Sequence, residues 1–458
     1  MFGMPGNLSE ILIEDCNSQE FGKVSSGKTD DRIILHCDLN NFYASVECLF
    51  HPEFKGLPVA VGGSVEKRHG IILAKNQLAK SFGIKTAEPI WQAKAKCPNL
   101  VLIPPDMSKY VRYSEMVRDI YERFTDIIEP FGIDECWLDI TGSALLIGNG
   151  EYIAGKIRET VRTELGLTVS VGVSWNKIFA KLGSDMKKPD ATTIITRENY
   201  KETVWPLPVE DLLFVGRKTA YQLRRIGIGT IGRLAVLDEA FLRKQFGKWG
   251  GTLWAFANGM DASPVEKNWA DVKAKGIGNS MTTPHDINSY EDAKAVFVLL
   301  AESVARRLRE SGLRGHTVAI SLRDCDLESI ERQRGMESAT CVSGDLIAAA
   351  MRLLRENWHP GRSKPLRSMG IRVTNLEETD APIQLSFFNS FQNIEKSENI
   401  EKAIDKIREK FGDDSVMRAL LLKKDKHKKP AADTSVSETT INRKFPASAD
   451  TDTDKQVT

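Results

Sequence analysis

The segment HCDLNNFYASVE, residues 36–47, follows the apolar run Ile33–Leu35 and poses the central question about this chain. The apolar run predicts a buried strand that ends at Asp38. An aspartate at the junction of a strand and a helix is usually a helix N-cap or a turn residue. Two adjacent aromatic residues, Phe42 and Tyr43, follow it. The segment is therefore either an ordinary strand-to-helix junction or part of a reactive site.

The composition is that of a globular protein without a strong overall charge. The 458 residues are enough for about three domains, and 63 Lys and Arg stand against 62 Asp and Glu, so any nucleic-acid-binding surface must be local. Seven scattered cysteines, with no CxxC pair, indicate buried thiols in a reducing compartment. No stretch approaches 18 apolar residues, and the N-terminus lacks the apolar part of a signal peptide. We therefore expect a cytoplasmic protein with no membrane partner.

The first large region, residues 31–197, alternates apolar strand-like runs with helical stretches, which predicts one mixed α/β domain. Its predicted strands are Arg32–Leu39, Leu57–Val61, Ile71–Leu73, Leu100–Ile103 and Thr168–Val173. Its predicted helices are Asn41–Cys48, Lys109–Ile127, Tyr152–Leu165 and Lys177–Ser184. The residues before this region have no sustained period and are expected to form a loose extension.

The next region, residues 205–260, is rich in glycine and in short helical stretches. It contains VGRKTAYQLRRIGIGTIGRLA, residues 215–235, which predicts two short helices joined by a glycine-containing turn. Backbone N–H groups at such a turn can bind a phosphate, although a plain helical hairpin fits this segment equally well.

Residues 275–376 have the order β-α-β-α-β, which predicts a small sheet with helices on one face. The predicted strands and helices are Gly276–Met281, Ser289–Ser311, Thr317–Arg323, Gly344–Asn357 and Leu366–Val373. After residue 390, apolar residues recur at steps of four, three and four and predict an amphipathic helix. These residues are Ile400, Ile404, Ile407 and Phe411.

A second acidic segment is FGIDECWLDITGS, residues 131–143. Its Asp134 and Glu135 can reach one site only if the chain turns there, which Gly132 allows. Together with Asp38 they would form a group of carboxylates at adjacent strand ends, and these would repel one another unless a cation lay between them. Oxygen-only ligands suit magnesium, and two such ions would support in-line phosphoryl or nucleotidyl transfer. Taken alone, each acidic segment is better explained as a surface turn.

A third segment, SVGVSWNKIFAKLGSDMKKP, covers residues 170–189 and leads from a buried strand into a lysine-bearing helix. Lysines beside a carboxylate–metal site would neutralise a triphosphate. We expect Lys177 and Lys181 to lie instead on a solvated face of the helix.

In this order and at these separations, the three segments resemble the motifs of the Y-family DNA polymerases, with the best match to their DNA polymerase IV (DinB) branch. The resemblance extends over residues 31–388 and implies an α/β multidomain, right-hand polymerase with a ferredoxin-like palm, small fingers, a helical thumb and an α+β little finger. The implied parts are an N-terminal extension (1–30), palm and fingers (31–204, fingers about 51–106), thumb (205–260), linker (261–274), little finger (275–376), a clamp-binding segment (377–390), a C-terminal helical segment (391–422) and a disordered tail (423–458).

The resemblance implies a catalytic site that holds two Mg²⁺ ions. The implied metal ligands are the side chains of Asp38, Asp134 and Glu135 and the backbone carbonyl of Leu39. Asp139 is expected to support this site without binding the metal.

The resemblance also implies the nucleotide contacts. Tyr43 matches the steric gate that excludes a 2′-hydroxyl, and the backbone amides of Phe42 and Tyr43 would contact the triphosphate. Lys188 matches a lysine that binds the phosphates. Gln77 and Lys80 stand where many relatives have Tyr and Arg, and Lys80 keeps the charge without the two-pronged guanidinium. We expect catalysis to survive this departure, with an altered nucleotide affinity.

Near the end of the matched region lies QLSFF, residues 384–388. It resembles the pentapeptide with which bacterial polymerases bind the sliding clamp, through Gln384, Leu385, Phe387 and Phe388. A last strand packed on its own domain is the alternative.

The function implied is low-fidelity, template-directed DNA synthesis past damaged bases by a monomeric enzyme. The substrates would be primer–template DNA and deoxynucleoside triphosphates, and the primer 3′-hydroxyl would attack the α-phosphate. Two alternatives are a non-catalytic DNA- and clamp-binding member and a nucleotide cyclase. Intact carboxylates speak against the first, and the thumb-like and little-finger-like regions and Tyr43 against the second.

Overall fold

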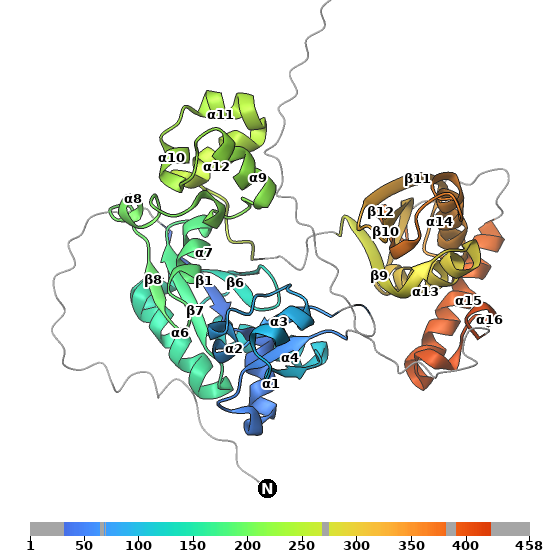
Figure 1. Cartoon of the computed structure of the whole chain (residues 1–458), viewed down its shortest axis with the longest axis horizontal. Coiled ribbons are helices and arrows are strands. Elements are labelled where there is room, and N and C mark those ends of the chain that lie inside the picture. The colour runs from blue at the N-terminus through green and yellow to red at the C-terminus, as the bar shows by residue number, and fades with distance from the viewer. Residues whose placement is uncertain (1–31, 65–67, 69, 268–273, 382–390, 423–458) are drawn as a thin grey trace, which may run out of the picture.

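The structure is a computed structural model that describes residues 32–64, 68, 70–267, 274–381 and 391–422 (Figure 1). The segments 1–30 and 423–458 and the residues Gln384–Phe388 of the predicted clamp motif lie outside the described residues. Among the described helices, none combines the length and the apolar character needed to cross a lipid bilayer.

A five-stranded sheet with the order β5-β6-β1-β7-β8 forms the centre of the first region. Its strands are β1 (Ile34–Leu39), β5 (Ile128–Pro130), β6 (Glu135–Asp139), β7 (Val169–Ser174) and β8 (Thr192–Ile194). The middle strand β1 pairs antiparallel with both β6 and β7 and is buried along its whole length. The helices around this sheet are α1 (Phe42–Phe50), α4 (Met107–Glu122), α5 (Thr141–Ile147), α6 (Gly150–Leu165) and α7 (Lys177–Met186).

The alternation of side chains along β1 assigns its residues to two different layers. Leu35, Cys37 and Leu39 belong to a core that also contains buried residues of α4 and α6. The even-numbered residues face α7 instead: Ile34 packs in a cluster with Ala180, and the Nδ1 of His36 lies 2.8 Å from the hydroxyl of Ser184. Since Asp38 follows in the same phase, β1 aims its carboxylate at α7.

The predicted strands of this region are all present and belong to two sheets, whereas β5, β6 and β8 were not predicted. The second sheet has the order β3-β2-β4, with strands β2 (Val59–Gly62), β3 (Ile72–Lys75) and β4 (Val101–Ile103). It carries the short helices η1 (Pro52–Phe54), α2 (Gln77–Ser81) and α3 (Ile90–Lys96). It has a small core of its own, because its buried residues pack against one another in a separate cluster.

The glycine-rich region folds into short helices as predicted. They are η2 (Val209–Asp211), α9 (Arg217–Arg225), α10 (Ile231–Ala235), α11 (Glu239–Phe246) and α12 (Lys248–Ala257), and the short helix α8 (Tyr200–Thr203) precedes them. The turn between α9 and α10 contains Gly227 at φ 82°, where a glycine is favoured. Phe214 has φ 69°, a left-handed conformation that glycine adopts more readily than phenylalanine.

The last large unit is a four-stranded sheet with α13 and α14 on one face (Figure 1). Its order is β11-β10-β12-β9, and its strands are β9 (Gly276–Ile287), β10 (Leu313–Asp324), β11 (Ser329–Thr340) and β12 (Leu366–Glu378). The helices are α13 (Tyr290–Glu310), α14 (Ser343–Asn357), α15 (Phe391–Phe411), η4 (Asp413–Ser415) and α16 (Ala419–Leu422). The predicted three-stranded order was wrong, because β11 was missed. Most of this edge strand is exposed, so it has no apolar alternation.

The contact between β7 and α7 requires a glycine at position 172. A Cβ atom there would lie 1.9 Å from the carbonyl oxygen of Ala180 and 2.5 Å from the backbone nitrogen of Ser184. We predict that Gly172→Ala destabilises the protein by at least about 2 kcal/mol, because α7 must move. Gly155→Ala is the matched control, since its Cβ meets no atom within 4 Å and the helix interior favours alanine. Urea unfolding of both variants measures the difference, and equal stabilities would contradict the prediction.

Candidate active site

The end of β1 brings the two acidic segments together. The antiparallel register places Asp38 directly opposite Glu135, so both side chains leave the sheet on the same face. Asp134 is held next to them because its carbonyl oxygen accepts a hydrogen bond from the Leu39 backbone N–H at 3.0 Å. Asp38 is not a helix cap, since the N-cap of α1 is Asn41. Asp38 lies within β1, so it is neither the cap nor a turn residue of this strand-to-helix junction.

Two lysines of the α7 segment neutralise these carboxylates. The Nζ atom of Lys181 lies 3.1 Å from both Asp38 Oδ2 and Glu135 Oε1, and the Nζ atom of Lys188 lies 2.6 Å from Asp38 Oδ2. The prediction of a solvated face for Lys181 was wrong, because its side chain is only 12% exposed. The sequence spacing of Lys181 from Lys177 gives no information about β1 and β6, whose acidic residues lie beside Lys181 in the structure.

Two further residues of the site were missed by the sequence analysis. Asp185 accepts from both lysines, at 3.1 Å from Lys181 Nζ and 2.9 Å from Lys188 Nζ, and its i−4 and i+3 spacing could have shown this. Asn40 is buried, and its Oδ1 atom accepts a 2.6 Å hydrogen bond from the backbone N–H of Asp190. This bond ties the end of β1 to the turn that carries Lys188, a long-range contact that no local pattern signals.

Burial and the repulsion of neighbouring carboxylates raise the pKa values of Asp38 and Asp134. Burial, followed by the charges of Glu135 and Asp38, raises the pKa of Asp134 to about 7. Burial and Glu135 also raise the pKa of Asp38, although Lys181 and Lys188 oppose the rise. Burial lowers the pKa of Lys181, but its three carboxylate neighbours outweigh this effect and raise that pKa above its usual value. The ammonium groups therefore stay charged.

The donor set of this site fits a divalent cation. The four acidic side chains of Asp38, Asp134, Glu135 and Asp185 outnumber the two ammonium groups beside them, so carboxyl oxygens are left over for a cation. Oxygen-only ligands of this kind suit magnesium. Within the described part of the chain, no three acidic, histidine or cysteine side chains are arranged as a ligand set.

Lys177 has a different place from the one predicted for it. It is buried, and its Nζ atom lies 2.6 Å from Glu129 Oε2 and 3.3 Å from the carbonyl oxygen of Pro264. The same Glu129 oxygen accepts a 2.9 Å hydrogen bond from the backbone N–H of Glu266. The pair thus attaches the chain that leaves α12 to the five-stranded sheet, and the expectation of a solvated lysine was wrong.

The aromatic residues of the opening segment stand at the start of α1. Phe42 is buried, whereas Tyr43 is partly buried and its ring stacks on Tyr110 with the ring centres 4.2 Å apart. The Tyr110 hydroxyl donates a 2.7 Å hydrogen bond to the buried carboxylate of Glu47, and Lys109 Nζ lies 3.2 Å from that carboxylate. This support fixes the position of the Tyr43 ring.

Gln77 and Lys80 lie on α2, and both are exposed. The preceding strand β3 lies beside α1, since Ala74 packs against the core that contains Phe42. Lys75 adds a second basic group, and burial together with the charge of Lys80 lowers its pKa. Asp139 accepts a 2.6 Å hydrogen bond from the hydroxyl of Thr141 at the start of α5, which agrees with a structural role.

Two family models match the chain. The model of the impB/mucB/samB family matches residues 37–185, which include the whole carboxylate cluster, and the model of the C-terminal domain of that family matches residues 274–387.

Curated relatives match most of the chain. DNA polymerase IV of Acetivibrio thermocellus is 51% identical over 391 residues, which are 85% of this chain and 98% of the relative. DNA polymerase IV of Clostridium kluyveri is 38% identical over 86% of this chain and 100% of the relative. A solved Y-family DNA polymerase chimera has the same fold, with a TM-score of 0.66 and 23% identity, over 75% of this chain and 98% of that one.

Because the pKa of Asp134 is raised, we predict that the free energy of unfolding of the metal-free protein decreases as the pH rises. Its pKa of about 7 in the fold lies above the value of about 4 in an unfolded chain, so its contribution to stability is lost as pH rises from 4 to 7. Asp134→Asn removes this dependence, and its stability relative to wild type should grow by about 3 kcal/mol between pH 5 and pH 8. Urea unfolding in the presence of a chelator, from pH 5 to pH 8, measures the difference. A pH-independent difference, or the same trend in the exposed control Glu337→Gln, would contradict this assignment.

Proposed function

The chain belongs to the DNA polymerase IV branch of the Y-family DNA polymerases, and from this membership we propose how its own residues carry out DNA synthesis. It is a DNA-directed DNA polymerase of low fidelity that acts in translesion synthesis. Its substrates are primer–template DNA and nucleotides, and polymerases of this family use divalent metal ions. The family match to polymerases favours this function over a non-catalytic DNA-binding role.

The carboxylate cluster at the ends of β1 and β6 is the observation that carries the proposal. Asp38, Asp134 and Glu135 would hold two Mg²⁺ ions, with the Leu39 carbonyl as a backbone ligand. When bound, the ions supply the positive charge that stabilises the attacking and leaving oxygens. Lys181 and Lys188 neutralise these acids in the structure, so we expect both ammonium groups to shift when the cations bind.

We propose that the nucleotide lies between this cluster and the start of α1. Lys188 would leave Asp38 and bind the triphosphate, and the backbone amides of Phe42 and Tyr43 would contact the same phosphates. The ring of Tyr43, supported by Tyr110, would lie beneath the sugar and exclude a 2′-hydroxyl. Gln77 and Lys80 would approach the phosphates from α2.

We propose which structural unit corresponds to each part of the polymerase. The five-stranded unit would be the palm, the three-stranded unit the fingers and the helices of residues 205–260 the thumb. Residues 275–376 would be the little finger, whose open sheet face carries the exposed Arg323 and Arg372 for contact with the DNA backbone. We further propose a cytoplasmic monomer that binds the sliding clamp through Gln384, Leu385, Phe387 and Phe388.

The metal assignment is tested by primer extension with magnesium and deoxynucleotides on undamaged and abasic templates. We predict that Asp134→Ala/Glu135→Ala lowers the rate by at least about 10³-fold, because the charge that stabilises the transition state is lost. DNA binding, measured by fluorescence anisotropy, should stay close to wild type. Extension by the variant at the wild-type rate would refute the assignment.

The steric-gate assignment predicts a change in sugar discrimination. Tyr43→Ala should lower the preference for deoxynucleotides over ribonucleotides by at least about tenfold, because a bulky side chain no longer occupies the space of the 2′-hydroxyl. Deoxynucleotide insertion should change much less. Tyr152→Ala, on an exposed part of α6, is the control. Single-nucleotide kcat/KM values measure the ratio, and an unchanged ratio in Tyr43→Ala would remove Tyr43 from this role.

A further inference from the structure

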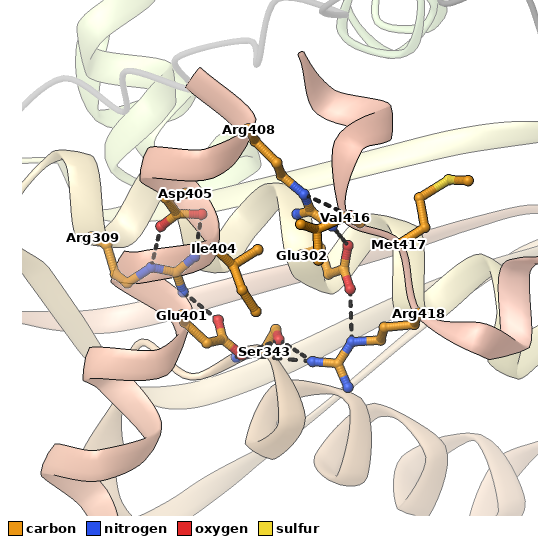
Figure 2. Close-up of a pocket in the computed structure, with 10 residues that line it drawn as sticks. All are labelled: Glu302, Arg309, Ser343, Glu401, Ile404, Asp405, Arg408, Val416, Met417 and Arg418. Carbon is orange, nitrogen blue, oxygen red and sulfur yellow. Dashed lines mark hydrogen bonds and ion pairs between the residues drawn. The ribbon is translucent and has the colours of Figure 1, made fainter. Parts of the chain in front are cut away.

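A closed network of ion pairs attaches the C-terminal helix α15 to α13. Arg309 of α13 binds Asp405 of α15 through two hydrogen bonds of 2.7 and 3.0 Å and also pairs with Glu401 (Figure 2). Glu302 of α13 lies 2.8 Å from a guanidinium nitrogen of Arg408. The charged side chains around the cavity of about 350 Å³ between these helices pair with one another, so the network is complete within the protein.

The ion pairs, rather than apolar burial, determine how α15 lies. Its apolar stripe of Ile400, Ile407 and Phe411 is 51%, 40% and 67% exposed, and only Ile404 of the predicted apolar face lines the cavity (Figure 2). Buried ion pairs contribute little net stability, but they can define one arrangement of the groups that they join. A second polar network that joins distant segments lies beside the carboxylate cluster.

The side chain of Asn40 is the centre of this second network and is 4% exposed. Its Nδ2 atom donates hydrogen bonds of 3.1 Å to the carbonyl oxygen of Asp38 and to the hydroxyl of Ser170 in β7. Its Oδ1 atom accepts one of 3.0 Å from the Ser170 hydroxyl and one of 2.6 Å from the backbone N–H of Asp190. Both ends of the amide are therefore used.

The two backbone partners fix the orientation of the Asn40 amide. A backbone N–H can only donate and a backbone carbonyl can only accept, so Oδ1 must face Asp190 and Nδ2 must face Asp38. A buried polar group left without a partner is unfavourable, which disfavours any shift of these segments relative to each other. Asn40 thus holds the end of β1 against a turn that lies 150 residues further along the chain.

Two arginines of α6 hold Asp190 from its other side. Arg158 Nε lies 3.1 Å from Asp190 Oδ1, and its guanidinium also donates to the Asp190 carbonyl oxygen. Arg162 pairs with Asp190 Oδ2. The φ angle of Asp190 is 50°, a left-handed conformation that a residue with a side chain keeps only where its surroundings hold it. These contacts therefore fix the turn that carries Lys188.

Lys188 reaches from this turn back to the carboxylate cluster. Its Nζ atom lies 2.6 Å from Asp38 Oδ2 and 2.9 Å from Asp185 Oδ1. In the proposed mechanism this ammonium group leaves Asp38 and binds the triphosphate. Because Asn40 and Arg158 hold the backbone of the turn, only the lysine side chain has to move, and less freedom is lost when the nucleotide binds.

We propose that Asn40 and Arg158 are positioning residues for the nucleotide. They hold the turn at Asp190 so that the ammonium group of Lys188 can reach both Asp38 and the triphosphate. This inference rests on the proposed phosphate contact of Lys188. If either hold is removed, the turn gains conformational freedom that the triphosphate must restrict again, and the affinity for the nucleotide falls.

The test is single-nucleotide insertion by the full-length protein on undamaged primer–template DNA with magnesium. Asn40→Ala and Arg158→Gln should each raise the KM for the deoxynucleotide about tenfold. Arg158→Gln should change kcat by less than about twofold, because Arg158 contacts none of the clustered carboxylates. Arg123→Gln is the matched control, since it breaks a two-pronged pair with Glu164, and its KM should equal that of wild type. A wild-type KM in both Asn40→Ala and Arg158→Gln would overturn the proposal.

A double-mutant cycle separates positioning from a general effect on the fold. In a Lys188→Ala background neither Asn40→Ala nor Arg158→Gln should raise KM further, because the group that they position is absent. Increases in KM that multiply with that of Lys188→Ala would contradict positioning. If Asn40→Ala does not fold, as thermal unfolding would show, the cycle with the partly exposed Arg158 decides the question.

Lys188→Ala alone separates this inference from the proposed function. An unchanged KM in Lys188→Ala would remove Lys188 from phosphate binding, and the inference would fall with it. A raised KM in Lys188→Ala, together with wild-type values in Asn40→Ala and Arg158→Gln, would keep the phosphate contact and refute the positioning roles alone.

Discussion

The contact between β1 and α7 is the constraint on which the site depends. A strand presents alternate side chains to opposite faces, so β1 gives its odd-numbered residues to the core beneath α4 and α6 and its even-numbered residues to α7. Asp38 consequently meets Lys181 rather than solvent. Gly172 allows α7 to approach closely enough for this pairing.

The electrostatics of the site follow from that approach. Buried carboxylates opposite one another are unfavourable, as the raised pKa of Asp134 shows, and the two lysines offset only part of the repulsion. The remaining negative charge favours the binding of divalent cations. In the proposed mechanism Lys188, which neutralises Asp38 in the structure, would bind the phosphates instead.

The two lysine pairs illustrate different uses of buried charge. Lys181 and Lys188 each pair with more than one acid at the edge of the site. Lys177 and Glu129 form a closed pair that attaches the chain after α12 to the central sheet. The ion pairs of Arg309 resemble the second case, since they fix a helix in one orientation although its apolar stripe stays outside.

The sequence by itself determined the mixed α/β character, most of the strand and helix positions and the resemblance to Y-family polymerases, because these depend on local periodicity and on short motifs. It also identified Asp38, Asp134 and Glu135 as candidate site residues. The antiparallel register of β1 and β6 explains why these residues lie close together. It missed the strands β5, β6, β8 and β11, the burial of Lys177 and Lys181, and the roles of Asn40 and Asp185. These were decided only by the tertiary structure, because burial, ion pairing and the orientation of α15 depend on residues far apart in the chain that no local pattern connects.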